Sequence, residues 1–373
     1  MARSEYYVRP TNGDDTNAGT SHAEAWLTVQ HALDTITVDT TDGDRINICD
    51  ESTLTISSLL DPTTFGNPGR PGLIFQGYTS VSGDGGIFHI DADSNKVIEQ
   101  STYDYISFID GKISNWPSST LAIRLDAKCN LINMEFDGLG IATKAVWLGT
   151  GGFIQGCKFH DFNTGYADTV RVGGCYMFIN NFVEVYSENV GLRVSYNSTI
   201  IGNMFLMTHA NASWGVMTSS ANLCLIANNT FLANTPCNGA GVYLSGTTSS
   251  GCTIINNYFE GFSDSGYGIY STATQNMCLL LSNNYYYNNT DNESIAADTV
   301  RVINAPVTLS ASGVMNNAWV SGDLDLSPAK ELINNALVTQ FAAGDTVHSK
   351  DVGAVQRAKG VIGGPNMQAG RAR

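Results

Sequence analysis

The chain has 373 residues, of which 43% are hydrophobic and only 14% are charged, and it contains 38 Gly against 9 Pro. This composition is typical of a folded, glycine-rich β protein and excludes a largely disordered chain. The formal net charge of −15 argues against DNA or RNA as a partner, because binding phosphates requires a basic surface.

Residues 1–42 are predicted to form an N-terminal cap. A turn-rich stretch, NGDDTNAGTS, precedes Trp26, Val29, Leu33 and Ile36, which recur at helical spacing. We expect this segment to place an amphipathic helix over the first turn of the repeat described next. The first residues hold no apolar segment that would direct secretion, and no apolar run approaches membrane-spanning length. We therefore expect synthesis in the cytoplasm and no membrane insertion.

Residues 43–320 contain a repeat of apolar residues, then Asn or Gly, then an aromatic residue. The aromatic positions are Phe136, Phe159, Phe182, Phe205, Phe231, Phe259 and Tyr286, at intervals of 23, 23, 23, 26, 28 and 27 residues. The repeated segments are short and β-branched, which is typical of strands. A period near 23 residues fits one turn of a three-sided coil. The predicted fold is therefore all-β, a single-stranded right-handed parallel β-helix in which these aromatic residues form one column.

Three further series keep a fixed offset before the aromatic residue. They are Asn180, Asn203, Asn229, Asn257 and Asn284 (two before), Leu131, Ile154, Met177, Ile200, Ile226, Ile254 and Leu281 (five before), and Cys129, Cys175, Cys224 and Cys252 (seven before). Asn tolerates the left-handed conformation of a sharp corner, and stacked Asn side chains can hydrogen-bond to one another. The other two series share the inner face of a strand. We therefore predict a corner asparagine ladder, an aliphatic column and buried cysteines that bind no metal.

A second strand in each turn has alternating inward and outward residues, as in AVWLG, TVRVG, GLRVS, GVMTS, GVYLS and GIYST. The outward residues are Trp147, Arg171, Arg193, Met217, Tyr243 and Tyr270. Turns about 4.8 Å apart would stack them into one stripe. Aromatic rings stack on sugars, and guanidinium groups bind carboxylates or sulfates. The sequence thus predicts that Trp147, Arg171, Arg193, Tyr243 and Tyr270 bind a polysaccharide or glycan receptor; the alternative is an ordinary solvated surface.

Residues 321–373 are predicted to close the solenoid and to end in a basic, glycine-rich tail. Arg357, Lys359, Arg371 and Arg373 lie in this tail, and no acidic residue follows Asp351. Such a segment is expected to be flexible and is suited to docking on another protein.

Both ends of the chain carry motifs of one superfamily. The start, YYV-x-P-x-x-G-x-D-x-x-x-G-T-S followed by W-x-T-x-Q-x-A-L, resembles the N-terminal signature of pectate-lyase-like right-handed β-helix proteins. GDLDLSPAKELINNA and then KDVGAVQ resemble the closing pattern, although Lys330, Glu331 and Asn334 depart from its usual form. The resemblance implies a β-helix over nearly the whole chain. It does not imply one function, because the superfamily includes lyases, hydrolases, epimerases, adhesins and phage tailspikes.

Candidate catalytic residues come from matching offsets. Asp161 and Glu184 each lie two positions after a repeat aromatic, and His160 is adjacent. Stacked carboxylates about 5 Å apart resemble the geometry of a retaining glycosidase. A lyase would instead use Arg171 or Arg193 as the base and its carboxylates to bind Ca²⁺; no cofactor is required otherwise. The alternative for these acids is a solvated turn.

A β-helix without a secretion signal, with reduced cysteines and a basic tail, is similar to bacteriophage virion proteins, which leave the host by lysis. The leading hypothesis is therefore a virion-associated structural or receptor-binding protein with a carbohydrate-binding face, found in virions or outside the cell after release. The alternatives are a polysaccharide lyase or glycoside hydrolase, and a cell-surface adhesin. The expected partners are a glycan and, through the tail, other virion proteins. A homo-oligomer would assemble through the tail or an exposed sheet face.

Overall fold

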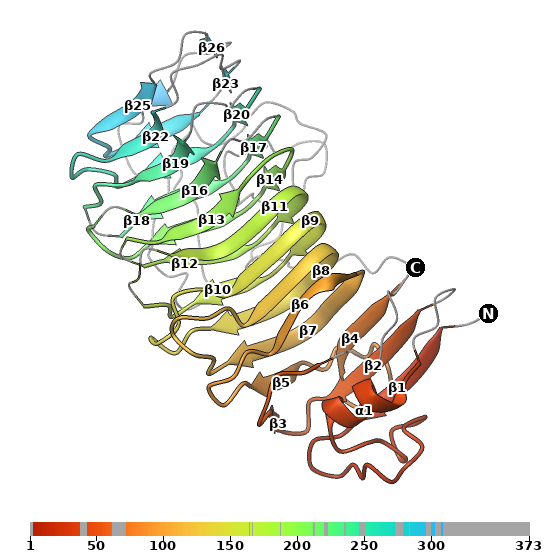
Figure 1. The fold of residues 1–373 in the computed structure, drawn as a ribbon. Coiled ribbons are helices and arrows are strands. Elements are labelled where there is room, and N and C mark those ends of the chain that lie inside the picture. Colours follow the sequence, from red (N-terminus) through yellow and green to blue (C-terminus); the bar gives the residue numbers. More distant parts are fainter. Residues whose placement is uncertain are drawn as a thin grey trace, which may run out of the picture. The chain divides into compact units, whose positions relative to one another are not determined.

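The computed structural model describes residues 3–37, 43–61, 72–302 and 307–308, apart from 164, 166, 187, 212, 220–222, 235, 246–250, 273–278, 283 and 296–299. Over these residues the chain is an all-β parallel β-helix, in which each strand pairs in parallel with strands of the neighbouring turns (Figure 1). The predicted closing segment and basic tail, 321–373, lie outside the described residues.

The chain divides into two compact units, each a stack of parallel turns. Unit 1 comprises Met1–Asn163 and Thr169–Gly173, and unit 2 comprises Thr164–Asp168 and Gly174–Arg373. Unit 1 contains β1 (Ser4–Val8), β2 (Asp44–Cys49), β3 (Thr53–Thr55), β4 (Leu73–Tyr78), β5 (Phe88–Asp91), β6 (Ile98–Asp104), β7 (Ile106–Ser114), β8 (Ile123–Asp137), β9 (Val146–Gln155) and β10 (Lys158–His160). Strand β11 (Asp168–Ile179) has residues in both units.

Unit 2 holds the shorter strands of the later turns. They are β12 (Phe182–Val185), β13 (Val190–Val194), β14 (Thr199–Ile201), β15 (Met204–Met207), β16 (Trp214–Ser219), β17 (Leu225–Ala227), β18 (Thr230–Ala233), β19 (Ala240–Ser245), β20 (Thr253–Ile255), β21 (Tyr258–Glu260), β22 (Tyr267–Ser271), β23 (Leu279–Ser282), β24 (Tyr285–Tyr287), β25 (Asp291–Ile295), β26 (Val300–Val302) and β27 (Val307–Thr308). The residues of one strand meet those of the strand one turn later, so the core consists of columns.

The core of unit 1 includes two columns that run through its strands. One of them contains Ile46, Phe75, Phe108, Leu131 and Ile154, each paired with the next and each fully buried. Burying a side chain of this size stabilises the fold by about 1.5–3 kcal/mol. The second column leads through Ile90 and Ile113 to Phe136 and Phe159, whose rings stack with centroids 5.0 Å apart. These registers confirm the predicted columns in unit 1.

The aromatic and aliphatic columns continue in unit 2. The rings of Phe205, Phe231, Phe259 and Tyr286 stack with successive centroid separations of 5.0, 4.9 and 5.2 Å. Ile200, Ile226, Ile254 and Leu281 are likewise paired in order and buried. The repeat spacing therefore predicted these positions correctly.

The prediction was wrong by one residue around β11 and β12. Val183, not Phe182, pairs with Phe205, and Phe178, not Met177, pairs with Ile200. Met177 is 43% exposed, and Cys175 is exposed as well. The segment CYMFINNF fits both registers, because Asn occupies two adjacent positions, 180 and 181, and an apolar residue is available for each column in either register. The observed register buries Tyr176, Phe178 and Val183, which removes more apolar area from water than Cys175 and Met177 would.

The corner asparagine ladder is present, and the change of register affects only its first member, which is Asn181 and not Asn180. It comprises Asn181, Asn203, Asn229, Asn257 and Asn284, each donating from Nδ2 to Oδ1 of the next over 3.0, 2.9, 3.0 and 3.1 Å. The Nδ2 of Asn229 also donates to the carbonyl of Ile200. The left-handed residue is the one before the ladder residue: Asn180, Gly202 and Asn228 have φ of 54°, 68° and 55°. Corner geometry and ladder hydrogen bonds thus belong to adjacent residues.

The predicted N-terminal helix is shorter than its pattern. Helix α1 (Val29–Thr35) begins after Thr28, whose side chain accepts a hydrogen bond from the His31 N–H. Trp26 lies outside the helix, is buried and bridges to Val8. The helix buries Val29, Ala32 and Leu33 and contacts β1 and β2; its role as a cap stays a prediction. Within the described ranges, no helix has the length and apolar character needed to cross a membrane.

Candidate active site on the outer face of unit 1

Two columns of polar residues lie on the outside of one sheet of unit 1. The first contains Thr53, His89, Lys112, Glu135 and Lys158, and the second contains Thr55, Asp91, Ser114, Asp137 and His160. Between them, the buried residues Ile90, Ile113 and Phe136 point into the core. Strand alternation therefore places two outward side chains on every turn, at a spacing of about 4.8 Å.

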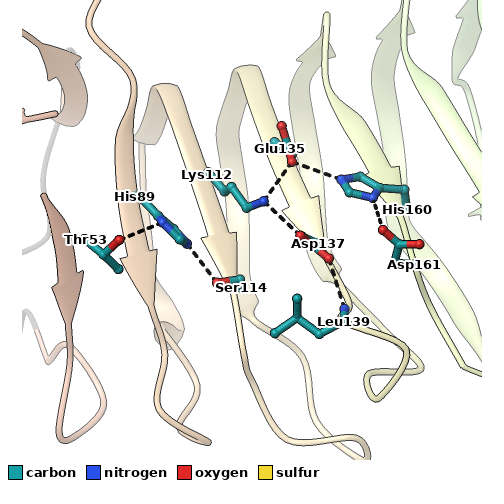
Figure 2. Close-up of polar contacts among 9 residues, drawn as sticks. All are labelled: Thr53, His89, Lys112, Ser114, Glu135, Asp137, Leu139, His160 and Asp161. Atoms are coloured by element: carbon teal, nitrogen blue, oxygen red, sulfur yellow. Dashed lines mark hydrogen bonds and ion pairs between the residues drawn. The ribbon is translucent and has the colours of Figure 1, made fainter. Parts of the chain in front are cut away.

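Four of these outer side chains and one neighbour of theirs are joined in what we call the acid–base cluster: Lys112, Glu135, Asp137, His160 and the adjacent corner residue Asp161. Lys112 Nζ donates to Glu135 over 3.0 Å and to Asp137 over 2.8 Å. His160 Nε2 lies 3.1 Å from Glu135, and His160 Nδ1 lies 2.6 Å from Asp161. Figure 2 shows Glu135 between Lys112 and His160. The cluster is thus one continuous chain of charged hydrogen bonds.

The charged forms of the cluster stabilise one another. Hydrogen bonds from His160 and then Lys112 lower the pKa of Glu135 to about 2, against the effect of burial. Burial lowers the pKa of His160, but hydrogen bonds to Glu135 and Asp161 outweigh it, so the His160 pKa is raised above 6.5. Contacts with Asp137 and Glu135 likewise raise the pKa of Lys112 despite its burial. At neutral pH, therefore, Glu135 is an anion and His160 holds a proton readily.

His89 lies in the first column next to Thr53, and its pKa is shifted in the opposite direction to that of His160. Its Nδ1 is 2.9 Å from the Thr53 hydroxyl and its Nε2 is 2.8 Å from the Ser114 hydroxyl. Burial and then the positive charge of Lys112 lower its pKa below 6.5. His89 is consequently a neutral imidazole near pH 7, whereas His160 favours the imidazolium.

A backbone loop after β8 holds the cluster in place. The Gly138 N–H donates to the carbonyl of His160 over 2.9 Å, and the Gly140 N–H donates to the carbonyl of Asp161 over 2.6 Å. The Leu139 N–H donates to the Asp137 carboxylate over 3.1 Å. The side chains of Leu139 and Ile141 are 48% and 51% exposed. The loop therefore adds an apolar edge beside the charged groups (Figure 2).

Three cluster residues have atoms that are suited to metal ligation. The ligand atoms of Glu135, Asp137 and His160 lie within 4.8 Å of one another. The Lys112 ammonium, however, is bonded to both carboxylates, so it already supplies the cation between them. A divalent ion at this position would have to displace Lys112, and Ca²⁺ prefers six or more oxygen ligands. These residues do not fit Ca²⁺, and the calcium requirement of a lyase stays a prediction.

The two predicted catalytic acids lie in different units. Asp161 belongs to unit 1, and its side chain is 62% exposed. Glu184, in β12 of unit 2, is half-buried and pairs with Leu206. Asp161 lies two positions after the column residue Phe159, but Glu184 lies only one after Val183, so the matching offsets do not hold. A catalytic role for either residue stays a prediction.

Sequence reasoning missed Lys112, Glu135 and Asp137. A usable signal was present: K-x-S, E-x-D and K-x-H flank Ile113, Phe136 and Phe159 at the 23-residue period. The predicted acids Asp161 and Glu184 share a single offset, two positions after the aromatic residue. The positions immediately before and after it carry the cluster.

The predicted outward stripe has the expected placement within each unit. In unit 1 the Trp147 ring lies between the guanidinium groups of Arg124 and Arg171, at 4.2 and 5.2 Å from its centroid. Arg124 also pairs with Glu99, whereas Arg171 is exposed and has no ion pair with any residue that the structure describes. A cation held over an indole in this way is stabilised by the ring and keeps its N–H groups available.

In unit 2, Arg193, Met217, Tyr243 and Tyr270 are paired in order. The rings of Tyr243 and Tyr270 stack at 5.3 Å, and Trp214 extends the stack at 5.5 Å from Tyr243. Arg193 is held by Asp168 over 2.6 Å. The stripe is therefore mainly aromatic in unit 2, and its binding role stays a prediction.

Comparisons with known proteins address the fold. No family model matches the sequence, and no curated protein matches it. The chain is similar to the crystal structure of pectate lyase Pel9A, with 14% identity over 96% of this chain and 97% of that chain and a TM-score of 0.50. It is also similar to a GH136 lacto-N-biosidase from Eubacterium ramulus (11% identity, 81% and 68% coverage, TM-score 0.48) and to a rhamnogalacturonan lyase (11%, 92% and 97%, 0.44). The chain therefore has the parallel β-helix fold of pectate-lyase-like proteins, as its repeat and its N-terminal motif predicted.

Proposed function

We propose that this protein acts on a polysaccharide and that the acid–base cluster of unit 1 is its reactive site. One observation carries the proposal: β7, β8 and β10 bring Lys112, Glu135 and His160 into one chain of charged hydrogen bonds on an outer face. Partly desolvated charges with pKa values shifted in opposite directions occur preferentially at functional sites. The similar pectate lyase supports a polysaccharide as the substrate class.

His160 is the proton donor in this proposal. Hydrogen bonds to Glu135 and Asp161 outweigh burial and raise its pKa, which favours the protonated form that a general acid needs. Asp161 is the exposed end of the chain, so a glycosidic oxygen that arrives from solvent would take the place of Asp161 at His160 Nδ1 and receive the proton there. Glu135 holds the other ring nitrogen and fixes the orientation of the imidazole.

The charge balance favours hydrolysis over elimination. A lyase that acts on uronates needs uncompensated positive charge to neutralise the sugar carboxylate. Here the cations Lys112, Lys158 and His160 face the three carboxylates Glu135, Asp137 and Asp161, so no excess positive charge remains. A neutral sugar at the point of cleavage fits this balance better than a uronate.

The test is incubation of the full chain with a panel of neutral and uronate-containing polysaccharides. New reducing ends without unsaturated uronates are the expected result. Unsaturated products would show that the reaction is an elimination and not a hydrolysis. The substitution His160→Gln is expected to lower kcat by roughly 10²–10⁴-fold, the usual contribution of a general acid. His209→Gln, in unit 2, is the matched control and should retain activity. Equal loss in both variants, or no cleavage of any polysaccharide, would contradict the assignment.

A second candidate function is glycan binding without cleavage, and the stacked rings of unit 2 favour it. Tyr243, Tyr270 and Trp214 form a partly exposed aromatic surface, and such surfaces are suited to stacking on sugars. Tyr243→Ala with Tyr270→Ala should abolish retardation in affinity electrophoresis with a bound polysaccharide, whereas the double Phe variant should retain it. Retardation without cleavage would support a receptor-binding role. No described residue bears on a virion-associated role, which stays a prediction.

A further inference from the structure

Two cysteines of unit 2 face each other on adjacent turns. Cys224 and Cys252 come directly before β17 and β20, whose first residues, Leu225 and Thr253, are paired in register. The Thr253 N–H donates to the carbonyl of Cys224 over 2.8 Å, so the pairing extends to the cysteines. Adjacent strands are about 4.8 Å apart. That separation lies within the Cα separation of about 4.4–6.8 Å that a disulfide requires.

The two thiols also point the same way. Cys224 and Cys252 are only 1% and 2% exposed, and the residues two positions later, Ile226 and Ile254, are fully buried on the same inner face. The thiols hydrogen-bond to each other in this interior. The register and the shared inward orientation therefore place the two thiols next to each other on adjacent turns.

We propose that Cys224 and Cys252 are a redox site, and that a disulfide oxidant converts them to an intramolecular disulfide that locks β17 to β20. One small disulfide is consumed for each protein disulfide formed. The first thiolate attacks the small disulfide, which releases one thiol and leaves a mixed disulfide on the protein. The second thiolate then displaces the other small thiol. Two protein thiols are oxidised, and their two protons leave on the two thiols released.

The environments of the two sulfurs assign the order of attack. The hydrogen bond from Cys252 lowers the pKa of Cys224 despite burial, whereas the same contact and burial raise the pKa of Cys252 strongly. The thiolate is the nucleophile in disulfide exchange. Cys224 therefore attacks the oxidant when local opening of this turn exposes it, and Cys252 resolves the mixed disulfide.

The bond would close a loop that contains β17, β18 and β19, and with them Tyr243 of the aromatic stripe. A cross-link across a loop of this length removes conformational freedom from the unfolded chain and stabilises the folded one. Oxidation would thus fasten the turns beneath the aromatic surface without adding any group to it.

The experiment uses the full chain carrying Cys175→Ser, which removes the exposed thiol among the cysteines that the structure describes. After incubation with oxidised glutathione, intact mass should fall by two hydrogen atoms, and peptide mapping should recover Cys224 linked to Cys252. The thermal unfolding midpoint should rise by several degrees and return after treatment with dithiothreitol. Cys252→Ser should trap glutathione on Cys224, whereas Cys224→Ser should trap none. Serine is tolerated in this column, because Ser198 occupies the same position one turn earlier.

Three results would overturn the proposal. The first is the absence of the linked peptide under conditions that glutathionylate Cys175 in the unmodified chain. The second is a link from Cys224 or Cys252 to any other cysteine. The third is an oxidised protein whose unfolding midpoint is unchanged or lower, which would contradict the proposed stabilisation by the disulfide. Glutathione trapped on Cys252 instead of Cys224 would reverse the order of attack.

Discussion

At the scale of single residues, Glu135 makes the stability of unit 1 depend on pH. Its pKa is about 2 in the folded chain against 4.5 for a free glutamate, so its contribution is present above pH 4.5 and is lost as pH falls toward 2. The wild type should therefore be more stable than Glu135→Gln above pH 4.5, and the difference should shrink below it. Denaturant unfolding at a series of pH values measures this.

His160→Gln is the matched control of opposite sign. The pKa of His160 is raised above 6.5 in the folded chain, so its contribution is complete below pH 6.5 and is lost as pH rises through the folded value. The two variants should thus diverge from the wild type in opposite pH windows. A parallel pH dependence in both would show that the hydrogen bonds joining Glu135 and His160 do not form in solution.

The asparagine ladder makes a second prediction for a single residue. Asn229 is fully buried, and its Oδ1 accepts from the backbone N–H and from Nδ2 of Asn203. Asn229→Ala removes the acceptor of the Asn203 backbone N–H, one of the acceptors of Asn203 Nδ2 and a donor to the Ile200 carbonyl, which should cost about 1–3 kcal/mol of unfolding free energy. Asn234→Ala, at an exposed position, is the control and should change stability by less than about 0.5 kcal/mol. Urea unfolding of both variants compares them.

At the scale of elements, the register of β12 can be tested by adding volume to it. Val183 pairs with Phe205, and the Phe178 ring already stacks on Phe205 at 6.2 Å. Val183→Phe should therefore overpack this turn and cost about 1–3 kcal/mol. In the alternative register, where Val183 points outward, the same change would be nearly neutral. Thermal unfolding of Val183→Phe decides between the two registers.

The sequence predicted most elements because each turn repeats the same demands. Short apolar segments near a 23-residue period required stacked strands, and inward columns such as Ile200 to Leu281 followed directly. The period failed at β12, where CYMFINNF satisfies two registers and only the buried volume of Tyr176 and Phe178 selects one. The helical spacing was misleading at the start of α1, because Trp26 fits that spacing but lies before the helix, where it is buried and bridges to Val8.

The candidate site was harder to predict because it depends on side chains that the repeat does not specify. Outward positions tolerate any polar residue, so the period located them without ranking them. His160 was noticed beside Asp161, but its link to Glu135 comes from the neighbouring turn and becomes visible only with the register. The partners of an outward side chain lie far from it in the sequence but close to it in space.

At the scale of the whole molecule, each turn contacts only its neighbours, so the loss of stability caused by a mutation should be confined to the mutated turn and the turns next to it. Solenoid repeats contact only their neighbours, so stability is approximately a sum over adjacent turns. Phe231→Ala removes a ring that stacks on Phe205 and Phe259 and should cost about 3–5 kcal/mol. Hydrogen exchange should increase in β15, β18 and β21 and stay unchanged in β2 and β4. A uniform increase in exchange would show that the chain unfolds as a single cooperative unit.

The corner ladder has a consequence for how such a chain can change length. Each asparagine inside the ladder donates from Nδ2 to the asparagine of the next turn and accepts at Oδ1 from the asparagine of the previous turn. Any two turns that carry the ladder can therefore pair with each other. A duplication or deletion that begins and ends at equivalent corners would insert or remove a whole coil and leave no hydrogen bond open. Growth by whole coils is therefore open to this gene, whereas an insertion of one residue inside a strand would turn the rest of that strand from inside to outside.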